Sequence, residues 1–272
     1  MTKKINLPNF NFKNILIGIY IIWYREILIY VRNREKFFTS IFLPLLLTLI
    51  FGTGLKNIFP MTNLPYDFSE FFFSGILGAS IATLAITSTM SIVWDREFGF
   101  LKEILVSPIS RSSIALGKIL GATTTALIEG LLLLLVAPSL NLHLSFISYL
   151  MSAIIIFLIS FGMASLGLII ASNIKKTESF NIIIQVLIAP LVFLSGAFFP
   201  VNNGPFWILK LSHYNPLTYG INALRWMILS QKIPTNIISN FTTNNLYVSL
   251  LICIVFDMII SLIAIYRFKQ IR

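Results

Sequence analysis

The sequence predicts an all-α integral membrane protein, and three features of composition and patterning lead to that class. Of the 272 residues, 57% are hydrophobic and only 11% are charged, whereas a soluble domain carries roughly a quarter charged residues. The apolar residues occur in blocks long enough to cross the ~30 Å hydrocarbon core of a bilayer as helices. The basic residues lie between these blocks and form no single stripe, which favours membrane orientation signals over a nucleic-acid interface.

Six apolar runs have the length of a transmembrane helix, about 20 residues. They cover approximately residues 37–55, 71–93, 114–137, 144–172, 180–199 and 246–266. Lipid offers no hydrogen-bond partner to a bare amide, so each run is expected to be a helix. Residues 1–272 are therefore predicted to form one transmembrane domain. Its larger connecting segments are residues 1–36, 94–113 and 200–245.

The distribution of Lys and Arg predicts the orientation of this domain. Basic residues are concentrated before the first span, in the loops after the second and fourth spans, and in the tail. Both termini are therefore expected in the cytosol, or in the stroma of a plastid. The frequent Ile, Asn, Lys and Phe residues indicate an AT-rich genome, so the predicted location is a bacterial inner membrane or a plastid membrane.

Residues 15–31 form a further apolar stretch, but Arg25 and Glu26 interrupt it. The longer uninterrupted part has about ten residues, too few to cross a bilayer. We predict a helix that lies in the cytosolic interface, with its basic residues towards anionic headgroups. The alternative is a seventh span that holds an internal ion pair.

The long segment at residues 200–245, on the non-cytosolic side, contains a second unusual stretch. Apolar residues recur there at helical spacing between Leu217 and Ile228, and Thr218, Asn222 and Arg225 form an adjoining polar stripe. The stretch is amphipathic and too short to span. It is expected to be a re-entrant or interfacial helix that acts as an outer gate, or equally a helix packed on the bundle without a gating role.

The common motifs of nucleotide-binding, hydrolytic and metal sites are absent. The segment nearest to a phosphate-binding loop, RSSIALGKIL, lacks the first glycine and has Ile119 where a magnesium-binding hydroxyl is needed. There is no HExxH, no GxSxG and only one cysteine, Cys253. We therefore expect no enzymatic activity and no cofactor or metal bound by this chain. If the protein uses ATP, a partner must bind it.

The cytosolic loop after the second span has the pattern of a short amphipathic helix. On a continuous helix, Phe98, Leu101 and Leu105 make one apolar stripe, and Pro108 would end the helix. The charged residues on its flanks are Asp95, Arg96, Lys102 and Glu103. Such a helix suits a cytosolic partner that grips and pushes it. The alternative is an ordinary loop with local ion pairs.

This loop resembles the cytosolic coupling segment of type-2 ATP-binding-cassette (ABC) exporter permeases, the family of drug-resistance, lipooligosaccharide and nodulation-factor exporters. The similar residues are DREFG at 95–99, EILVSPISR at 103–111 and LGK at 116–118. The opening at 23–55, with Pro44 inside its apolar run, and NPLTYGINALRWMIL at 215–229 are also similar. The resemblance thus covers nearly the whole chain in the expected order.

The resemblance implies a permease domain with six spans, a cytosolic interface helix and a homodimer or heterodimer of permeases served by separate ATPase subunits. ATP and Mg would be bound by the ATPase and not by this chain. It also implies that the loop contacts the ATPase through Asp95, Arg96, Glu97, Phe98, Gly99, Phe100, Leu101, Glu103 and Pro108. Phe100 departs from the family, in which a small or hydroxyl residue is usual there. We expect it to be an apolar anchor with the flanking charges paired around it.

Two acids are expected near the middle of the membrane. Glu129 lies eleven residues after Lys118, and Asp257 ten residues before Arg267, about 15 Å of helix in each case. A charged side chain at that depth costs about 2.5–3.5 kcal/mol. The acids either bind a substrate or proton, or are protonated and bridge helices.

The function predicted from these features is export of an amphipathic or lipid-like substrate, powered by an ATPase on another chain. A secondary transporter driven by ions or protons through Glu129 and Asp257, and a non-transporting assembly factor, are the alternatives.

Overall fold

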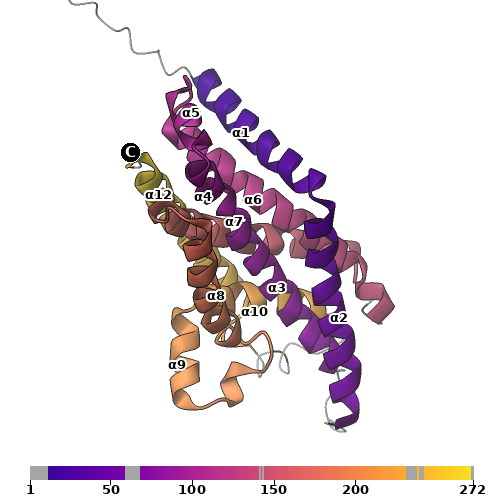
Figure 1. Ribbon diagram of the computed structural model, residues 1–272. Helices are drawn as coiled ribbons and strands as arrows, with labels where there is room; N and C mark the ends of the chain where they lie inside the picture. Colours follow the sequence, from indigo (N-terminus) through magenta and orange to yellow (C-terminus); the bar gives the residue numbers. More distant parts are fainter. Residues whose placement is uncertain are drawn as a thin grey trace, which may run out of the picture.

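A computed structural model describes residues 12–58, 68–140, 142, 144–230, 238 and 242–270, and the regular structure within these residues is helical. The long helices pack side by side into an elongated bundle (Figure 1). The α-helices are α1 (Phe12–Arg32), α2 (Arg34–Ile58), α3 (Phe68–Ser88), α4 (Met90–Glu97), α5 (Phe100–Val106), α6 (Arg111–Leu135), α7 (Phe146–Asn173), α8 (Thr177–Phe193), α9 (Phe206–Tyr214), α10 (Pro216–Leu229) and α12 (Leu246–Lys269). Short 3-10 turns at Ala137–Leu140 and Val201–Asn203 complete the pattern.

The all-helical class is confirmed for the described residues, but the set of long apolar helices differs from the predicted spans. Those long and apolar enough to cross a membrane are Lys13–Arg32, Glu70–Glu97, Arg111–Leu135, Phe146–Asn173 and Leu246–Lys269. The last four match predicted spans. The predicted first span lies within α2, whose described side chains form the apolar helix Phe37–Phe51, and the predicted fifth span corresponds to the shorter apolar helix Thr177–Phe193.

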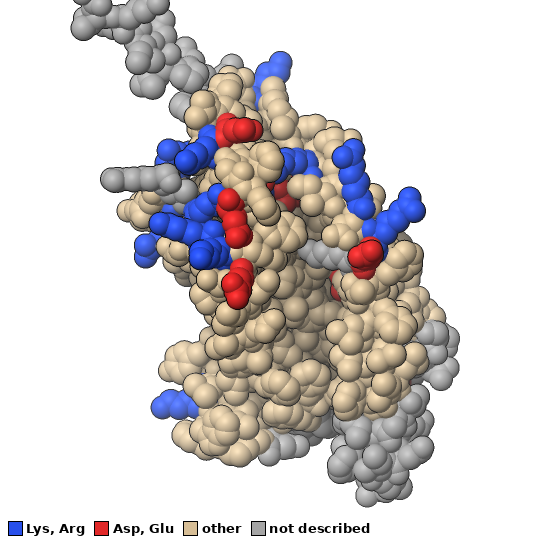
Figure 2. Space-filling model, in the orientation of Figure 1, with Lys and Arg blue, Asp and Glu red and all other residues tan. Residues whose placement is uncertain are grey.

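Helix α1 is among the helices that are long and apolar enough to cross a membrane, although it was predicted to lie at the cytosolic interface. It packs along α6 at the end of the molecule that also holds α4, α5 and the C-terminus of α12 (Figure 1). In Figure 2 the charged side chains of the visible face gather in this same half, whereas the half with α9 is almost uncharged. The position of α1 is therefore level with the charged end of the bundle.

Helix α10 lies inside the bundle, against α3, α7 and α12. The Asn215 side chain accepts from Leu217 N to cap it, and Pro216 occupies its first turn, where no amide hydrogen bond is lost. Close approach depends on small residues: a Cβ on Gly78 of α3 would lie 2.6 Å from Ile221 of α10. The polar stripe of this helix is buried, which differs from an amphipathic helix on the surface.

Candidate functional site

The cytosolic loop consists of two short helices and not of one continuous helix. Helix α4 ends at Glu97, and α5 begins at Phe100. Between them Gly99 has φ +85°, a left-handed conformation that side chains with a Cβ disfavour. The chain leaves α5 in extended conformation at Ser107, and the Ser110 side chain accepts from Ser113 N at the start of α6. The prediction of one continuous helix is therefore wrong. Hydrophobic periodicity does not reveal that a single residue, Gly99, takes a left-handed conformation and interrupts the helix.

Asp95 of α4 belongs to a buried charge cluster with Arg25 and Glu26 of α1 and Lys118 of α6. The Arg25 guanidinium donates to both Asp95 carboxylate oxygens, at 2.9 and 2.5 Å. The Lys118 ammonium donates to Asp95 and to Glu26, each at 2.6 Å, and to the Ser91 hydroxyl at 3.1 Å. Lys118 is 2% exposed and Asp95 5%. Buried charges require partners of opposite sign, and the cluster supplies one for each.

The next two residues of α4 bind the ends of other helices. Arg96 donates to the carbonyls of Ile174 and Ser172, at 2.6 and 2.9 Å, at the C-terminus of α7. The Glu97 carboxylate accepts from the backbone N–H of Thr177 at 2.9 Å and from its hydroxyl, at the N-terminus of α8. Each charge has the sign that complements the helix dipole it meets. These bonds join α4 to α7 and α8.

Asp95, Arg96 and Glu97 were expected to offer their charges to a partner, and in this structure each is bonded to another helix of the chain. Asp95 is buried, so its carboxylate is not on the surface of the loop. Arg96 is half-buried against α7, and Glu97, although exposed, is engaged by α8. Consecutive residues of α4 therefore tie the loop to α1 and α6, to α7 and to α8.

The exposed part of the loop is apolar at its centre. Phe98 is 70% exposed, Phe100 53% and Val106 87%; we call these three residues the α4–α5 tip. Leu101 is buried beneath it. The exposed neighbours of the tip include Lys102, Glu103 and Pro108.

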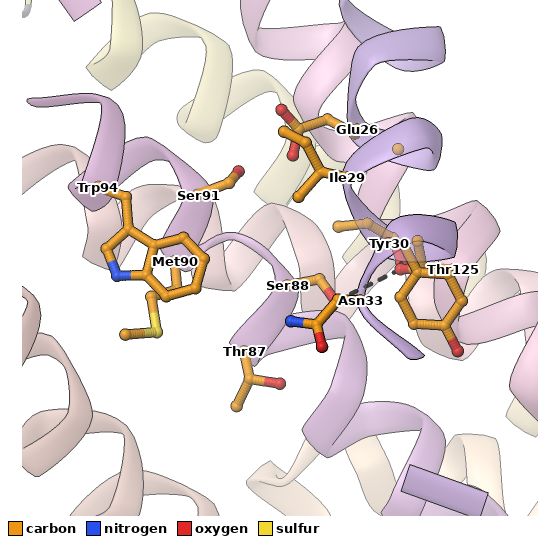
Figure 3. Close-up of a pocket in the computed structure, with 12 residues that line it drawn as sticks. Glu26, Ile29, Tyr30, Asn33, Thr87, Ser88, Met90, Ser91, Trp94 and Thr125 are labelled. Atoms are coloured by element: carbon orange, nitrogen blue, oxygen red, sulfur yellow. Dashed lines mark hydrogen bonds between the residues drawn. The ribbon is translucent and has the colours of Figure 1, made fainter. Parts of the chain in front are cut away.

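A small cavity of about 50 Å³ lies between α1 and α4, next to the charge cluster (Figure 3). Glu26 and Tyr30 border it from α1, and Ser91 and Trp94 from α4. A water molecule needs about 10–15 Å³ of such volume. The cavity therefore has room for a few waters beside the cluster and is too small for a substrate.

A much larger groove of about 520 Å³ is lined by α2, α3 and α8, with Phe198 beyond the end of α8. Glu129, from α6, lines it too and is 1% exposed. Apolar side chains such as Leu47, Ile76 and Val192 form most of its surface. Figure 2 shows the face hollowed between α8 and α2. The volume is that of a small-molecule site.

The second membrane acid, Asp257, is placed differently. It is 5% exposed and faces α7, where a Cβ added to Gly162 would lie 2.1 Å from its Oδ1. The cavity next to it measures about 10 Å³. Within the described part of the chain its Oδ2 accepts no hydrogen bond. The structure thus separates the two acids, because only Glu129 lines a space that could hold a molecule.

The residues expected at the outer gate are buried and bonded to the surrounding loops. Arg225 is 1% exposed, donates to the Gly196 carbonyl at 2.9 Å and stacks over the Phe71 ring at 3.7 Å. Asn222 donates to the Thr243 hydroxyl at 2.7 Å, and Thr218 to the Leu194 carbonyl at 3.5 Å. These contacts hold α10 in place.

Comparison with known proteins identifies the family. The family model described as ABC-2 type transporter matches residues 18–229. The chain belongs to the ABC-2 type transporter family. It is 29% identical to the transport permease ycf38 of Cyanophora paradoxa over 84% of this chain and 81% of that protein. It is 28% identical to nodulation protein J of Sinorhizobium fredii over 68% of this chain and 71% of the relative. The multidrug ABC transporter permease YbhR of Escherichia coli is 28% identical over 58% of this chain and 42% of its own length.

The protein is therefore a multi-pass membrane permease of an ABC transporter, as the resemblance implied. Its charge cluster includes residues that sequence reasoning did not assign to a site: Arg25, Glu26 and Lys118. The first two were noticed as an interruption of an apolar run, and the third was counted as a loop charge. The sequence did contain a signal for this cluster: residues of opposite charge lie within apolar stretches. Such charges are costly in a membrane unless they are paired.

Proposed function

We propose that this permease is the transmembrane half of an ABC exporter, and that a separate ATPase subunit carrying ATP and Mg docks on the α4–α5 tip. The observation that carries the proposal is the combination of exposed apolar side chains at the tip with the inward bonds of Asp95, Arg96 and Glu97. A partner that grips the tip would hold an element already bonded to the membrane helices.

The coupling path follows from these bonds. Movement of α5 carries α4 with it, and the charge cluster transmits the displacement to α1 and α6. The bonds from Arg96 and Glu97 transmit it to the adjoining ends of α7 and α8. Because α8 also forms one wall of the groove, closing of the ATPase beneath the tip would change the width of the groove. Asp95, Arg96 and Glu97 act in this path as positioning residues, while Phe98 and Phe100 contact the partner.

The proposed orientation places the charged end of the bundle in the cytosol or stroma, with both termini on that side and six spans between them. In this arrangement α1 is the interface helix, α2 and α8 provide the first and fifth spans, and α10 is re-entrant from the opposite side. The asymmetry of charge in Figure 2 supports it. The membrane would be a bacterial inner membrane or a plastid membrane, and the permease would work as a homodimer or heterodimer.

The groove is the proposed path for an amphipathic or lipid-like substrate. Its largely apolar lining suits an acyl chain or a similar apolar group.

The test is recovery of the ATPase with affinity-tagged permease from membranes that hold equal amounts of each variant. Among the recovered proteins, the ATPase is recognised by the phosphate-binding-loop motif in its sequence. Phe100→Ala removes a central apolar contact and is expected to weaken the complex by ~2 kcal/mol or more, whereas Lys102→Ala at the rim has little effect.

Phe206→Ala provides the matched control, because Phe206 is an exposed aromatic, 78% accessible, on α9. Its recovery of ATPase is expected to equal that of the wild type. Equal recovery for the wild type, Phe100→Ala and Phe98→Ala would remove the tip as the docking site.

A further inference from the structure

Four phenylalanine side chains meet at one end of the groove. Phe193, the last residue of α8, and Phe198 both line it, and their ring centroids are 5.1 Å apart. The Phe198 ring also lies 5.6 Å from that of Phe72 on α3, which in turn lies 5.1 Å from that of Phe51 on α2. These centroid distances are those of packed aromatic pairs. We call these four residues the phenylalanine cluster; it joins α2, α3 and the segment that follows α8.

The cluster marks the place where the groove ends. On α2, Leu47 is the last described side chain that lines the groove, and Phe51 follows it by one helical turn. On α3 the lining begins at Ile76, and Phe72 precedes it by one turn. Because α2 and α3 pack side by side and run antiparallel (Figure 1), these two turns lie at the same end of the groove. The contact between Phe51 and Phe72 therefore spans the gap between the helices and closes that end.

The opposite end of the groove carries hydroxyl side chains, which include Ser40 near the start of α2 and Thr83 and Thr87 near the end of α3. Each donates its proton to a main-chain carbonyl of its own helix, at 2.8 to 3.0 Å. An apolar occupant therefore leaves none of these three protons without an acceptor. The start of α2 follows α1 and the end of α3 precedes α4, so this end faces the charged half of the molecule (Figure 2).

We propose that the groove holds one unbranched hydrocarbon chain with its tip against the phenylalanine cluster, and that Phe198 determines the longest chain that fits. This inference rests on the proposed function, because it adds a length limit to the substrate class of the same groove. The walls are helices that run across the membrane, so a chain in the groove keeps the direction of the acyl chains of the bilayer. Its polar end lies among the hydroxyl groups, near the charged half of the molecule.

The segment that carries Phe198 is held by two helices. Arg225 of α10 donates to the Gly196 carbonyl at 2.9 Å. The segment also presses on α3, where a Cβ added to Gly75 would overlap the Ala197 carbonyl oxygen. A chain that is too long cannot push the Phe198 ring aside without breaking these contacts. The cluster is therefore a firm stop for the tip of the chain.

The proposal is tested on the full permease in nanodiscs of neutral lipid, without the ATPase. The probes are saturated monoacylglycerols of increasing chain length, which carry no charge and compete with one fluorescent monoacylglycerol. Their concentrations are expressed as mole fractions of the lipid, and empty nanodiscs give the background. In the wild type, affinity should rise with chain length up to a limit and then fall by about tenfold, because forcing extra methylenes into a closed site is unfavourable.

Phe198→Ala removes the ring that stops the chain, so the limit should move to longer chains. The first chain that is too long for the wild type should bind this variant about tenfold more tightly. Leu47→Trp adds bulk one turn before the cluster and should move the limit to shorter chains. This second variant keeps the proposal testable if Phe198→Ala folds poorly.

Phe199→Ala is the matched control, because Phe199 is the next residue of the same segment and is not among the described side chains that line the groove. Its length limit should equal that of the wild type. An equal shift of the limit in Phe198→Ala and Phe199→Ala would show a loosened segment instead of a stop at Phe198, and would contradict the proposal.

The absence of a length limit in the wild type, or the same limit in the wild type, Phe198→Ala and Leu47→Trp, would overturn the proposal. So would a second copy of the chain seated in the groove, detected as a Leu43→Cys to Val186→Cys disulfide between copies that abolishes probe binding. Any of these results with intact ATPase recovery would leave an exporter of another substrate class. A length limit together with unchanged ATPase recovery in the tip variants would instead contradict the proposed function alone.

Discussion

Lys118 carries its charge in a position that is 2% exposed, and the neighbouring side chains explain how it is tolerated. Its ammonium group contacts one carboxylate from α1 and one from α4, while Arg25 neutralises the remaining negative charge. The cluster joins three helices that are distant in sequence. A buried ion pair adds little stability compared with apolar packing, but removing one member leaves an uncompensated charge.

Lys118→Met is therefore expected to lower the free energy of unfolding by roughly 3–5 kcal/mol, because Glu26 and Asp95 then share only Arg25. Adding Glu26→Gln to Lys118→Met restores neutrality and should recover much of this loss. The measurement is unfolding by SDS titration of the purified variants. A double variant less stable than Lys118→Met alone would show that charge balance does not control the cluster.

The α4–α5 pair depends on a single backbone feature, the left-handed Gly99. Among the described residues other than its chain neighbours, none has a heavy atom within 4 Å of the place where a Cβ would stand, so these residues pose no steric obstacle to a substitution. The cost comes from the backbone itself, about 1–2 kcal/mol for an ordinary residue in this conformation. Straightening the turn would change the directions in which the Phe98 and Phe100 side chains point relative to α4, which is held in place by its bonds to other helices.

Gly99→Val is expected to reduce the amount of ATPase recovered with the permease, because the strained turn no longer presents both aromatic side chains together. Gly99→Asn should retain most of the recovery, since asparagine tolerates the left-handed region better than other residues. Membrane levels of the variants should be equal. If Gly99→Val recovers as much ATPase as wild type, the geometry of the turn does not matter for docking.

At the scale of the whole molecule, charge is distributed asymmetrically. The half that holds α1, α4 and α5 carries most charged side chains of the visible face (Figure 2), while α9 at the other end exposes Phe206, Trp207 and Tyr214. Aromatic side chains favour both membrane–water interfaces and do not distinguish them, whereas basic ones are retained on the cytosolic side. The charge asymmetry is therefore what supports the proposed orientation.

This orientation predicts the accessibility of introduced cysteines. In a Cys253→Ala background, Lys175→Cys should react with a membrane-impermeant maleimide only from the cytosolic or stromal side. His213→Cys, on α9, should react only from the opposite side; both positions are exposed in the fold. Labelling after permeabilisation is the control for reactivity. Reaction of Lys175→Cys from the outer face would reverse the proposed topology.

Much of the helical bundle was predictable because each apolar run must satisfy its own backbone hydrogen bonds in lipid. The helices α6, α7 and α12 fall close to their predicted limits. The short helix at residues 216–229 was also expected from its periodicity. The burial of this helix was not expected, because a polar stripe on a short helix is usually interpreted as its solvent-facing side. The tertiary structure supplies the hydrogen-bond partners of the stripe, which are Gly196, Leu194 and Thr243.

Composition and local pattern by themselves indicated a helical membrane protein and placed most of its long helices, while the resemblance to type-2 ABC exporter permeases selected the loop that is the candidate for coupling. The tertiary structure decided what the charged residues of that loop do. Asp95 has its partners 70 and 23 residues away, Arg96 reaches 78 residues along the chain and Glu97 reaches 80. Ion pairs and helix caps over such separations depend on how helices pack, and periodicity along one helix cannot encode that. For the same reason only the packed bundle could distinguish Glu129, which lines a groove, from Asp257, which is enclosed against Gly162.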